Sequence, residues 1–234
     1  MLELTEKPKS PTIIEGFPGF GFVSTITTEF LIKHLNAKKI GKFSTDKLLP
    51  ISVIHNSKVI DPIEIYFAKK ENLVILRPLA NVSGAEWEIA TLMQELAEKL
   101  KAKEIIGIEG ISAAGKSPDK SQVFYYTNCN NKKFEKAGIK DLKDGIVMGV
   151  TGVLLMKGDK LPISCLFAEA NPGLPDSRAA GEVIKILDAY LGLKVDYKPL
   201  MKTAQEVEEK LRGLLSKIKD TSVQKEKKET SYLG

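Results

Sequence analysis

The residues that most resemble a reactive site form a glycine-bounded segment, Gly110–Ser117 (GISAAGKS). Its spacing matches the P-loop, in which backbone N–H groups and a lysine hold the phosphates of a nucleotide. A P-loop must lead into a helix whose N-terminus faces those phosphates. Here the β-type run Lys120–Thr127 follows instead, so we expect a surface loop with an exposed Lys116. A nucleotide- or nucleoside-binding enzyme that uses this loop is the alternative hypothesis.

A second glycine-rich segment, Gly16–Gly21 (GFPGFG), lies between a predicted strand, Thr12–Glu15, and a predicted helix, Ser24–Leu35. Its order of glycines differs from the dinucleotide-binding pattern, and Pro18 removes a backbone donor. We therefore predict a structural turn that packs closely on the sheet, with a phosphate site at the start of the helix as the alternative. The predicted turn residues are Gly16, Pro18, Gly19 and Gly21.

Three predicted strands each end in a glutamate. These residues are Glu15, Glu109 and Glu169. Gathered at one edge of a sheet, they would raise one another's pKa and suit acid–base or metal chemistry. The favoured alternative is that each caps a helix N-terminus or pairs with a basic side chain. The basic candidates are Arg77, Lys116 and Arg178.

The histidines and cysteines form no recognisable reactive motif. His34 and His55 have no ligand or catalytic partner at a typical spacing, and Cys129 and Cys165 make neither a disulfide framework nor a metal-binding pattern. We therefore predict that the protein is not an enzyme, has no catalytic residue and uses no metal or cofactor. Two isolated thiols also favour a cytoplasmic protein with reduced cysteines.

Composition excludes several kinds of partner. The 35 basic residues interleave with 30 acidic ones, and the net charge of +5 forms no basic stripe with aromatic residues, so nucleic acid is not expected. No apolar run reaches the length of about 18 residues that a membrane span needs. The acidic start of the chain also lacks the features of a signal peptide.

Strands and helices alternate from residue 11 to about 197, which predicts a layered α/β sandwich with a mixed, largely parallel sheet. The segment Leu48–Leu76 contains no predicted helix, so we expect its successive strands to pair in an antiparallel excursion from the parallel sheet. Besides Ser24–Leu35, amphipathic helices are expected at Ala85–Lys101 and after Pro175-Asp176-Ser177. The last of these carries the apolar residues Ala180, Val183, Ile184, Leu187 and Leu191. Further strands are predicted at Ile51–Val53, Ile63–Phe67, Leu73–Leu76, Glu104–Glu109, Ile146–Leu155 and Ile163–Phe167.

The character of the chain changes after Pro199. Apolar residues then recur every three or four positions, as in a short coiled-coil seam; they are Ala204, Val207, Leu211, Leu214 and Ile218. This helix either docks on its own domain or faces another subunit or partner. We divide the chain into an α/β domain (1–198), an amphipathic helix (199–219) and a polar, disordered tail (220–234). The tail ends in an apolar tip, Tyr232, Leu233 and Gly234, which we predict to bind a partner.

Three segments together resemble the proteasome assembly chaperone family in its archaeal form. They are Gly16–Gly21, Gly145–Leu155 (GIVMGVTGVLL) and Ala168–Ala180 (AEANPGLPDSRAA). The resemblance covers residues 11 to 193 and implies an α/β sandwich like that of nucleoside phosphorylases, without established catalysis. It also implies a homo-oligomer that binds proteasome α subunits, during ring assembly or on finished rings, and that could work with a second assembly chaperone.

The same resemblance gives the C-terminal tail a role. Proteasome activators with similar tails end in a hydrophobic residue, a tyrosine and one further residue. Here Ser231 precedes Tyr232, and two residues follow the tyrosine. In such docking, Tyr232 would fill an apolar pocket and the carboxylate of Gly234 would meet a lysine. Several tails on one oligomer would add avidity.

Overall fold

The computed structural model describes residues 1–196, except 49, 51, 56, 80, 113–120, 130–132 and 160. In the described part, the strands are β1 (Leu2–Leu4), β2 (Thr12–Glu15), β3 (Lys38–Phe43), β4 (Val53–His55), β5 (Lys58–Ile60), β6 (Ile63–Ala68), β7 (Leu73–Pro78), β8 (Glu104–Ser112), β9 (Val123–Thr127), β10 (Lys140–Asp141) and β11 (Ile163–Ala170). The helices are a 3₁₀ turn η1 (Phe20–Phe22), α1 (Val23–His34), α2 (Glu86–Leu100), α3 (Lys133–Lys136), α4 (Gly149–Met156) and α5 (Ser177–Leu191).

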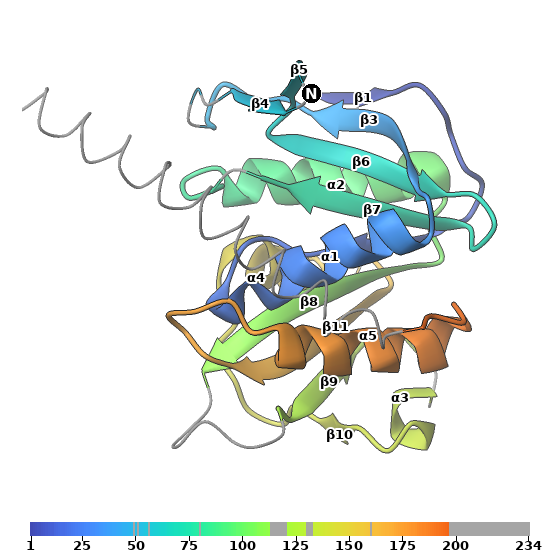
Figure 1. Ribbon diagram of the computed structural model, residues 1–234, viewed down its shortest axis with the longest axis vertical. Coiled ribbons are helices and arrows are strands. Elements are labelled where there is room, and N and C mark those ends of the chain that lie inside the picture. Colours follow the sequence, from blue (N-terminus) through green and yellow to red (C-terminus); the bar gives the residue numbers. More distant parts are fainter. Residues whose placement is uncertain are drawn as a thin grey trace, which may run out of the picture.

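Nine strands form one mixed sheet in the order β1-β3-β6-β7-β2-β8-β11-β9-β10 (Figure 1). The four central strands, β7, β2, β8 and β11, are parallel, whereas β1, β3 and β6 are joined to β7 by antiparallel pairing. Strands β4 and β5 form a separate hairpin. The predicted α/β class and the antiparallel excursion are both confirmed.

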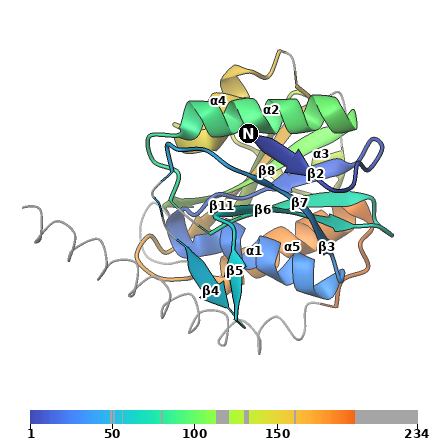
Figure 2. The same ribbon diagram turned by 90° about the horizontal axis from the view of Figure 1, so that it is seen from above.

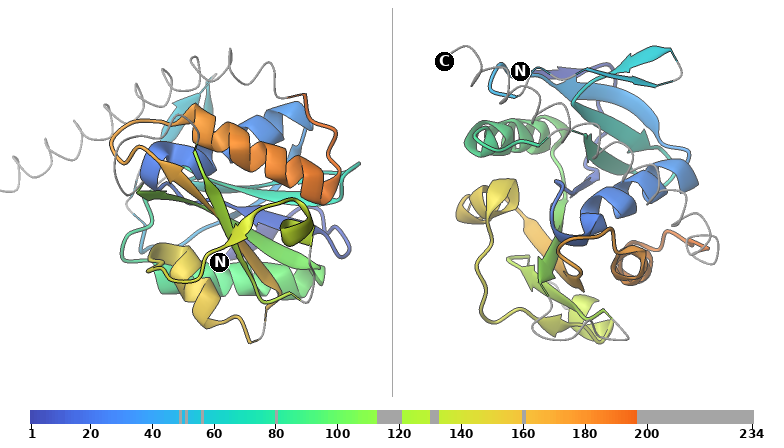
Figure 3. Two further views of the ribbon diagram at one scale, coloured as in Figure 1. Left: turned by 90° about the horizontal axis from the view of Figure 1, so that it is seen from below. Right: turned by 60° about the vertical axis from the view of Figure 1, so that its left-hand side comes forward.

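Two layers of helices enclose the sheet. Helices α1 and α5 pack together on one face, and α2 and α4 pack together on the other (Figures 2 and 3). Each side has its own apolar core, one around Ile13, Leu76 and Phe167 beneath α2 and α4, and one around Ile14 and Ile75 beneath α1 and α5. Because alternate residues of β2 point to opposite faces, this single strand contributes to both cores.

The amphipathic patterns predicted the main helices well. The expected helices Ser24–Leu35 and Ala85–Lys101 differ from α1 and α2 by one residue at each end. Helix α5 begins where Asp176 accepts a hydrogen bond from the Ala179 N–H at 3.0 Å, and it ends at Gly192, whose φ is +68°. A side-chain cap at the start and a left-handed glycine at the end are the usual signals for a helix of this kind.

The predicted strand at Ile146–Leu155 is wrong, because most of that segment is helix α4. Short apolar runs do not distinguish a buried strand from a buried helix by periodicity alone. Here Gly149 adopts a φ of +74° and turns the chain into the helix. The residues that α4 buries recur with helical spacing: Val150, Thr151, Val153 and Leu154.

No helix within the described ranges is long and apolar enough to cross a membrane.

Candidate functional site

The glycine turn Gly16–Gly21 lies at the carboxyl end of β2 and leads into α1 (Figure 1). Its backbone is fixed from both sides: Ser24 Oγ donates to the Phe17 carbonyl at 2.6 Å, and the Asp176 N–H donates to the Gly21 carbonyl at 2.8 Å. Gly21 has a φ of +63°, and a Cβ there would lie 2.6 Å from the Cβ of Ala170. The turn therefore has no room for a side chain at this position.

Two carboxyl groups lie beneath this turn, the fully buried Glu15 and the partly buried Glu109. Glu15 ends β2, and its register partner on β8 is Gly107, two residues before Glu109. Thr151, in the first turn of α4, joins the two groups: its Oγ1 lies 2.9 Å from Glu15 Oε1 and 2.5 Å from Glu109 Oε1. A Cβ added at Gly107 would lie 2.8 Å from Glu15 Oε1, so the absence of a side chain there makes room for the carboxyl group.

The surroundings of the pair favour its protonated forms. Burial, and next the nearby charge of Glu109, raise the pKa of Glu15 to about 8. Burial likewise raises the pKa of Glu109 to about 7, although the hydrogen bond from Thr151 opposes the rise. The Cys165 thiol on β11 also has a raised pKa, because it is buried and lies close to both carboxyl groups. The pair is thus a hydrogen-bonded acid site in an apolar environment.

The third carboxylate expected at this edge, Glu169, does not join the pair. Its register partner on β8 is Ile111, two residues beyond Glu109, so it lies past the buried part of the sheet. Its Oε2 instead accepts from the Gln122 N–H at 3.4 Å. Arg77, one of the expected basic partners, pairs with Glu29 and Glu64. No group of three or more histidine, cysteine or acidic side chains in the described part could hold a metal ion.

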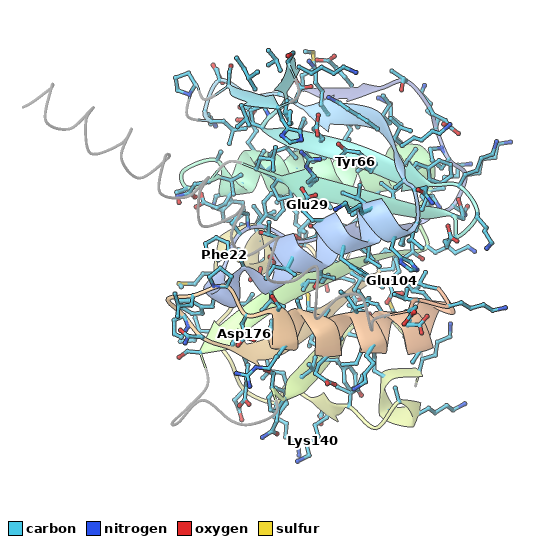
Figure 4. All side chains as sticks on the ribbon, viewed as in Figure 1. Phe22, Glu29, Tyr66, Glu104, Lys140 and Asp176 are labelled. Carbon is cyan, nitrogen blue, oxygen red and sulfur yellow. The ribbon has the colours of Figure 1, made fainter. Side chains whose placement is uncertain are left out.

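A second buried carboxylate site contrasts with this pair. Glu64 on β6 is 4% exposed and contacts two cations, with Lys39 Nζ at 2.5 Å and Arg77 Nη2 at 3.6 Å. Arg77 also reaches Glu29 of α1, and its Nη1 donates to the Tyr66 hydroxyl at 2.9 Å. Figure 4 shows Glu29 on α1 lying close to Tyr66 on β6. The charge of Glu64 is therefore neutralised in place, which makes the cluster a structural tie between α1 and the sheet.

The carboxyl ends of the parallel strands carry a concentration of exposed apolar side chains. We call this set the apolar edge: Phe20, Trp87, Ile146, Met148 and Leu174, which are 44%, 64%, 93%, 76% and 51% exposed. They follow β2, β7 and β11 or precede the N-terminus of α4. Figure 4 places Phe22 and Asp176 at this end of the sheet and Glu104, the first residue of β8, toward the other.

The hairpin β4–β5 begins and ends at the same edge, between β3 and β6. Its cross-strand pair Ile54 and Val59 is 73% and 68% exposed, whereas the neighbouring pair, Val53 and Ile60, is partly buried. A two-stranded hairpin outside a larger sheet is marginally stable without further packing.

Only the first three residues of the P-loop-like segment lie in the described part of the chain. Gly110, Ile111 and Ser112 belong to β8, and the next described element is strand β9 rather than a helix. Residues 113–120 lie outside the described ranges. The predicted partner-binding residues Tyr232, Leu233 and Gly234, the seam Val207, Leu211, Leu214 and Ile218, and the domain boundaries at 198 and 219 also lie there, so these remain predictions.

The sequence did not reveal Thr151 or the apolar edge. Thr151 was the one polar side chain in the apolar run Gly145–Leu155, which is a weak signal. The members of the apolar edge come from four separate parts of the chain, and no local pattern relates them. Of the sequence candidates, the structure brings Gly19 and Glu109 together: a Cβ at Gly19 would lie 3.4 Å from Glu109 Oε2.

The fold is an α/β sandwich with a mixed sheet, and exposed apolar side chains lie at the carboxyl ends of its parallel strands. The chain belongs to the PAC2 family, whose model matches residues 13–215. The resemblance to the proteasome assembly chaperone family is thereby confirmed.

Individual relatives agree with this assignment. PbaA of Pyrococcus furiosus, an archaeal homologue of proteasome-assembly chaperone, is 30% identical, with a TM-score of 0.81 over 95% of this chain and 100% of PbaA. PbaB of the same organism, an archaeal proteasome activator, shares the fold at 24% identity, with a TM-score of 0.76 over 92% of this chain and 98% of PbaB. The uncharacterized protein MJ0106 of Methanocaldococcus jannaschii is 29% identical over 91% of this chain and 90% of its own length.

Proposed function

We propose that this protein is a non-enzymatic assembly chaperone or adaptor that forms homo-oligomers in the cytoplasm and binds proteasome α subunits. The observation that carries the proposal is the similarity to PbaA over essentially the whole of both chains. The apolar edge supports it, because five exposed apolar side chains at one end of the sheet suit a protein partner better than a small substrate.

The C-terminal residues Tyr232, Leu233 and Gly234 are a second proposed contact. The order of these residues is similar to that of activator tails but not identical to it. We propose that the apolar edge and the tail contribute separately to binding. The tail would supply a weak contact that several copies on one oligomer strengthen through effective concentration. The helix at 199–219 would hold copies together or present the tails.

The experiment is a pull-down of archaeal proteasome α subunits by four forms of the full chain. They are the wild type, a deletion of residues 232–234, the double variant Trp87→Ser/Met148→Ser, and a matched control, Met156→Ser. Met156 is 64% exposed at the C-terminal end of α4, away from the apolar edge.

We expect the wild type and the control to retain α subunits, and the edge variant to lose most of them. The tail deletion should reduce retention only when the chain is oligomeric. Failure of the wild type to bind would contradict the proposed function itself. Equal binding by the edge variant and the control would show that the apolar edge does not contact α subunits. The proposed chaperone function would not be contradicted by that result.

A further inference from the structure

The Thr151 hydroxyl makes two short contacts with carboxyl oxygens, although it carries one hydrogen. It can donate to Glu15 or to Glu109, and in the other contact it must accept. An ionised carboxylate is acceptor-only, so it could not supply the second hydrogen bond. Contacts of 2.9 Å and 2.5 Å therefore require that one of the two carboxyl groups carries a proton and donates it to Thr151 Oγ1.

The distances and burial indicate which group is protonated. Hydrogen bonds from a hydroxyl to an ionised carboxylate are short, about 2.5 to 2.7 Å, which fits the contact with Glu109 and leaves Glu15 as the acid. Glu15 is fully buried, and its Oε2 has no hydrogen-bond partner. An unpartnered oxygen is much less costly on a neutral acid than on an ion.

No cation in the described part of the chain neutralises the pair. The titratable groups that act on it are the two carboxyl groups and the Cys165 thiol, while β7, the glycine turn and α4 contribute none. Glu64 is equally buried but contacts Lys39 and Arg77. The fold thus gives one buried carboxylate two cationic partners, whereas the described residues give the Glu15–Glu109 pair none.

We propose that Glu15 and Glu109 share one proton through Thr151 in the folded protein, and that losing this proton loosens the glycine turn above them. Two negative charges would then face each other beneath Gly19, one fully buried and one partly buried, where water screens their repulsion poorly. The turn carries Phe20, so the proton would control part of the apolar edge. The proposal concerns this chain's own carboxyl groups and does not depend on the identity of any partner.

The sign of the pH effect follows from proton linkage. The unfolded chain ionises both groups near their ordinary pKa, whereas the folded chain retains a proton up to about pH 8. Because burial also raises the pKa of Glu109 to about 7, folding takes up nearly two protons between roughly pH 5 and 7 and about one proton between pH 7 and 8. The unfolding constant therefore rises by at least about tenfold per pH unit over this range. Above that range this contribution to stability is fully lost.

The first test is a side-chain carboxyl NMR titration of the full-length wild type. We expect one glutamate to keep the chemical shift of a neutral acid at pH 7, and that signal to disappear in Glu15→Gln. If every glutamate carboxyl signal shows the ionised form at pH 6, the proposal is overturned. Because this measurement uses the wild type, it is decisive even where a variant fails to fold.

The second test compares denaturant unfolding at pH 5.5 to 9 for the wild type, Glu15→Gln and the control Glu182→Gln. The side-chain amide introduced by Glu15→Gln can donate to Thr151 without a titrating proton, so this variant should lose the Glu15 part of the pH dependence and show a shallower slope, with the Glu109 part retained. Glu182 is exposed on α5 beside Lys185, and its variant should keep the wild-type slope. Parallel slopes for all three proteins would contradict the shared proton.

Hydrogen exchange tests the turn itself. Comparing residues 16–22 of the wild type with those of Glu15→Gln at each pH cancels the intrinsic pH dependence of exchange. We expect equal protection at pH 6 and at least severalfold faster exchange in the wild type at pH 9. Equal rates at pH 9 would refute the coupling between the proton and the turn.

Discussion

Arg77 Nη2 lies 3.6 Å from Glu64 Oε2 in the part of the sheet where β6 and β7 pair beneath α1. The same guanidinium reaches Glu29 through Nε at 3.0 Å, so one side chain ties a helix to two strands. The Glu64 carboxylate is almost completely buried, and its charge depends on Arg77 and Lys39. Removing either cation would leave a buried charge only partly compensated.

We predict that Arg77→Gln lowers the free energy of unfolding by about 2 kcal/mol, because Lys39 continues to neutralise part of the Glu64 charge. Chemical denaturation at pH 7 measures this. The matched control is Lys185→Gln, which removes an exposed cation from an ion pair within α5 and should change stability by less than about 0.5 kcal/mol. Equal effects of the two substitutions would show that the Arg77 cluster does not support the fold.

Gly21 and Gly181 provide a second matched pair. Gly21→Ala should destabilise by about 2 kcal/mol, because it places a Cβ at positive φ and 2.6 Å from that of Ala170. Gly181→Ala lies inside α5 with nothing within 4 Å of the new Cβ, and should stabilise by up to about 1 kcal/mol. Thermal unfolding of both variants checks the signs. A neutral Gly21→Ala would mean that the turn is not rigid.

The P-loop-like segment should bind no nucleotide. Its first glycine lies inside β8, and the next element in the described part of the chain is strand β9, where a P-loop leads into a helix. Calorimetry with ATP, GDP and inorganic phosphate should detect no binding in the micromolar range. Micromolar binding that Lys116→Ala abolishes would instead support the alternative of a nucleotide enzyme.

The sequence predicted the elements whose apolar pattern has a single interpretation. Helix α2 has a clear buried stripe, and β2 is a short apolar run before a glycine turn. The prediction of a strand at Ile146–Leu155 was wrong because this segment is apolar at nearly every position. A buried strand and a buried helix both have that pattern.

The carboxyl pair corresponds to the less favoured of two alternatives that the sequence left open. Glu15 and Glu109 end neighbouring parallel strands, and the structure brings these two together through Thr151. Glu169 was misplaced because the register of β11 against β8 sets it two residues beyond Glu109, and no local pattern encodes that register. Thr151 is 136 residues from Glu15 in sequence and reaches it only through the packing of α4 on the sheet.

The most direct test of the account is native mass spectrometry of the full-length protein, alone and mixed with archaeal proteasome α subunits. We predict a homo-oligomer in the first sample and a new species containing both proteins in the second. A monomer that leaves the α-subunit masses unchanged at every ratio would contradict the proposed function.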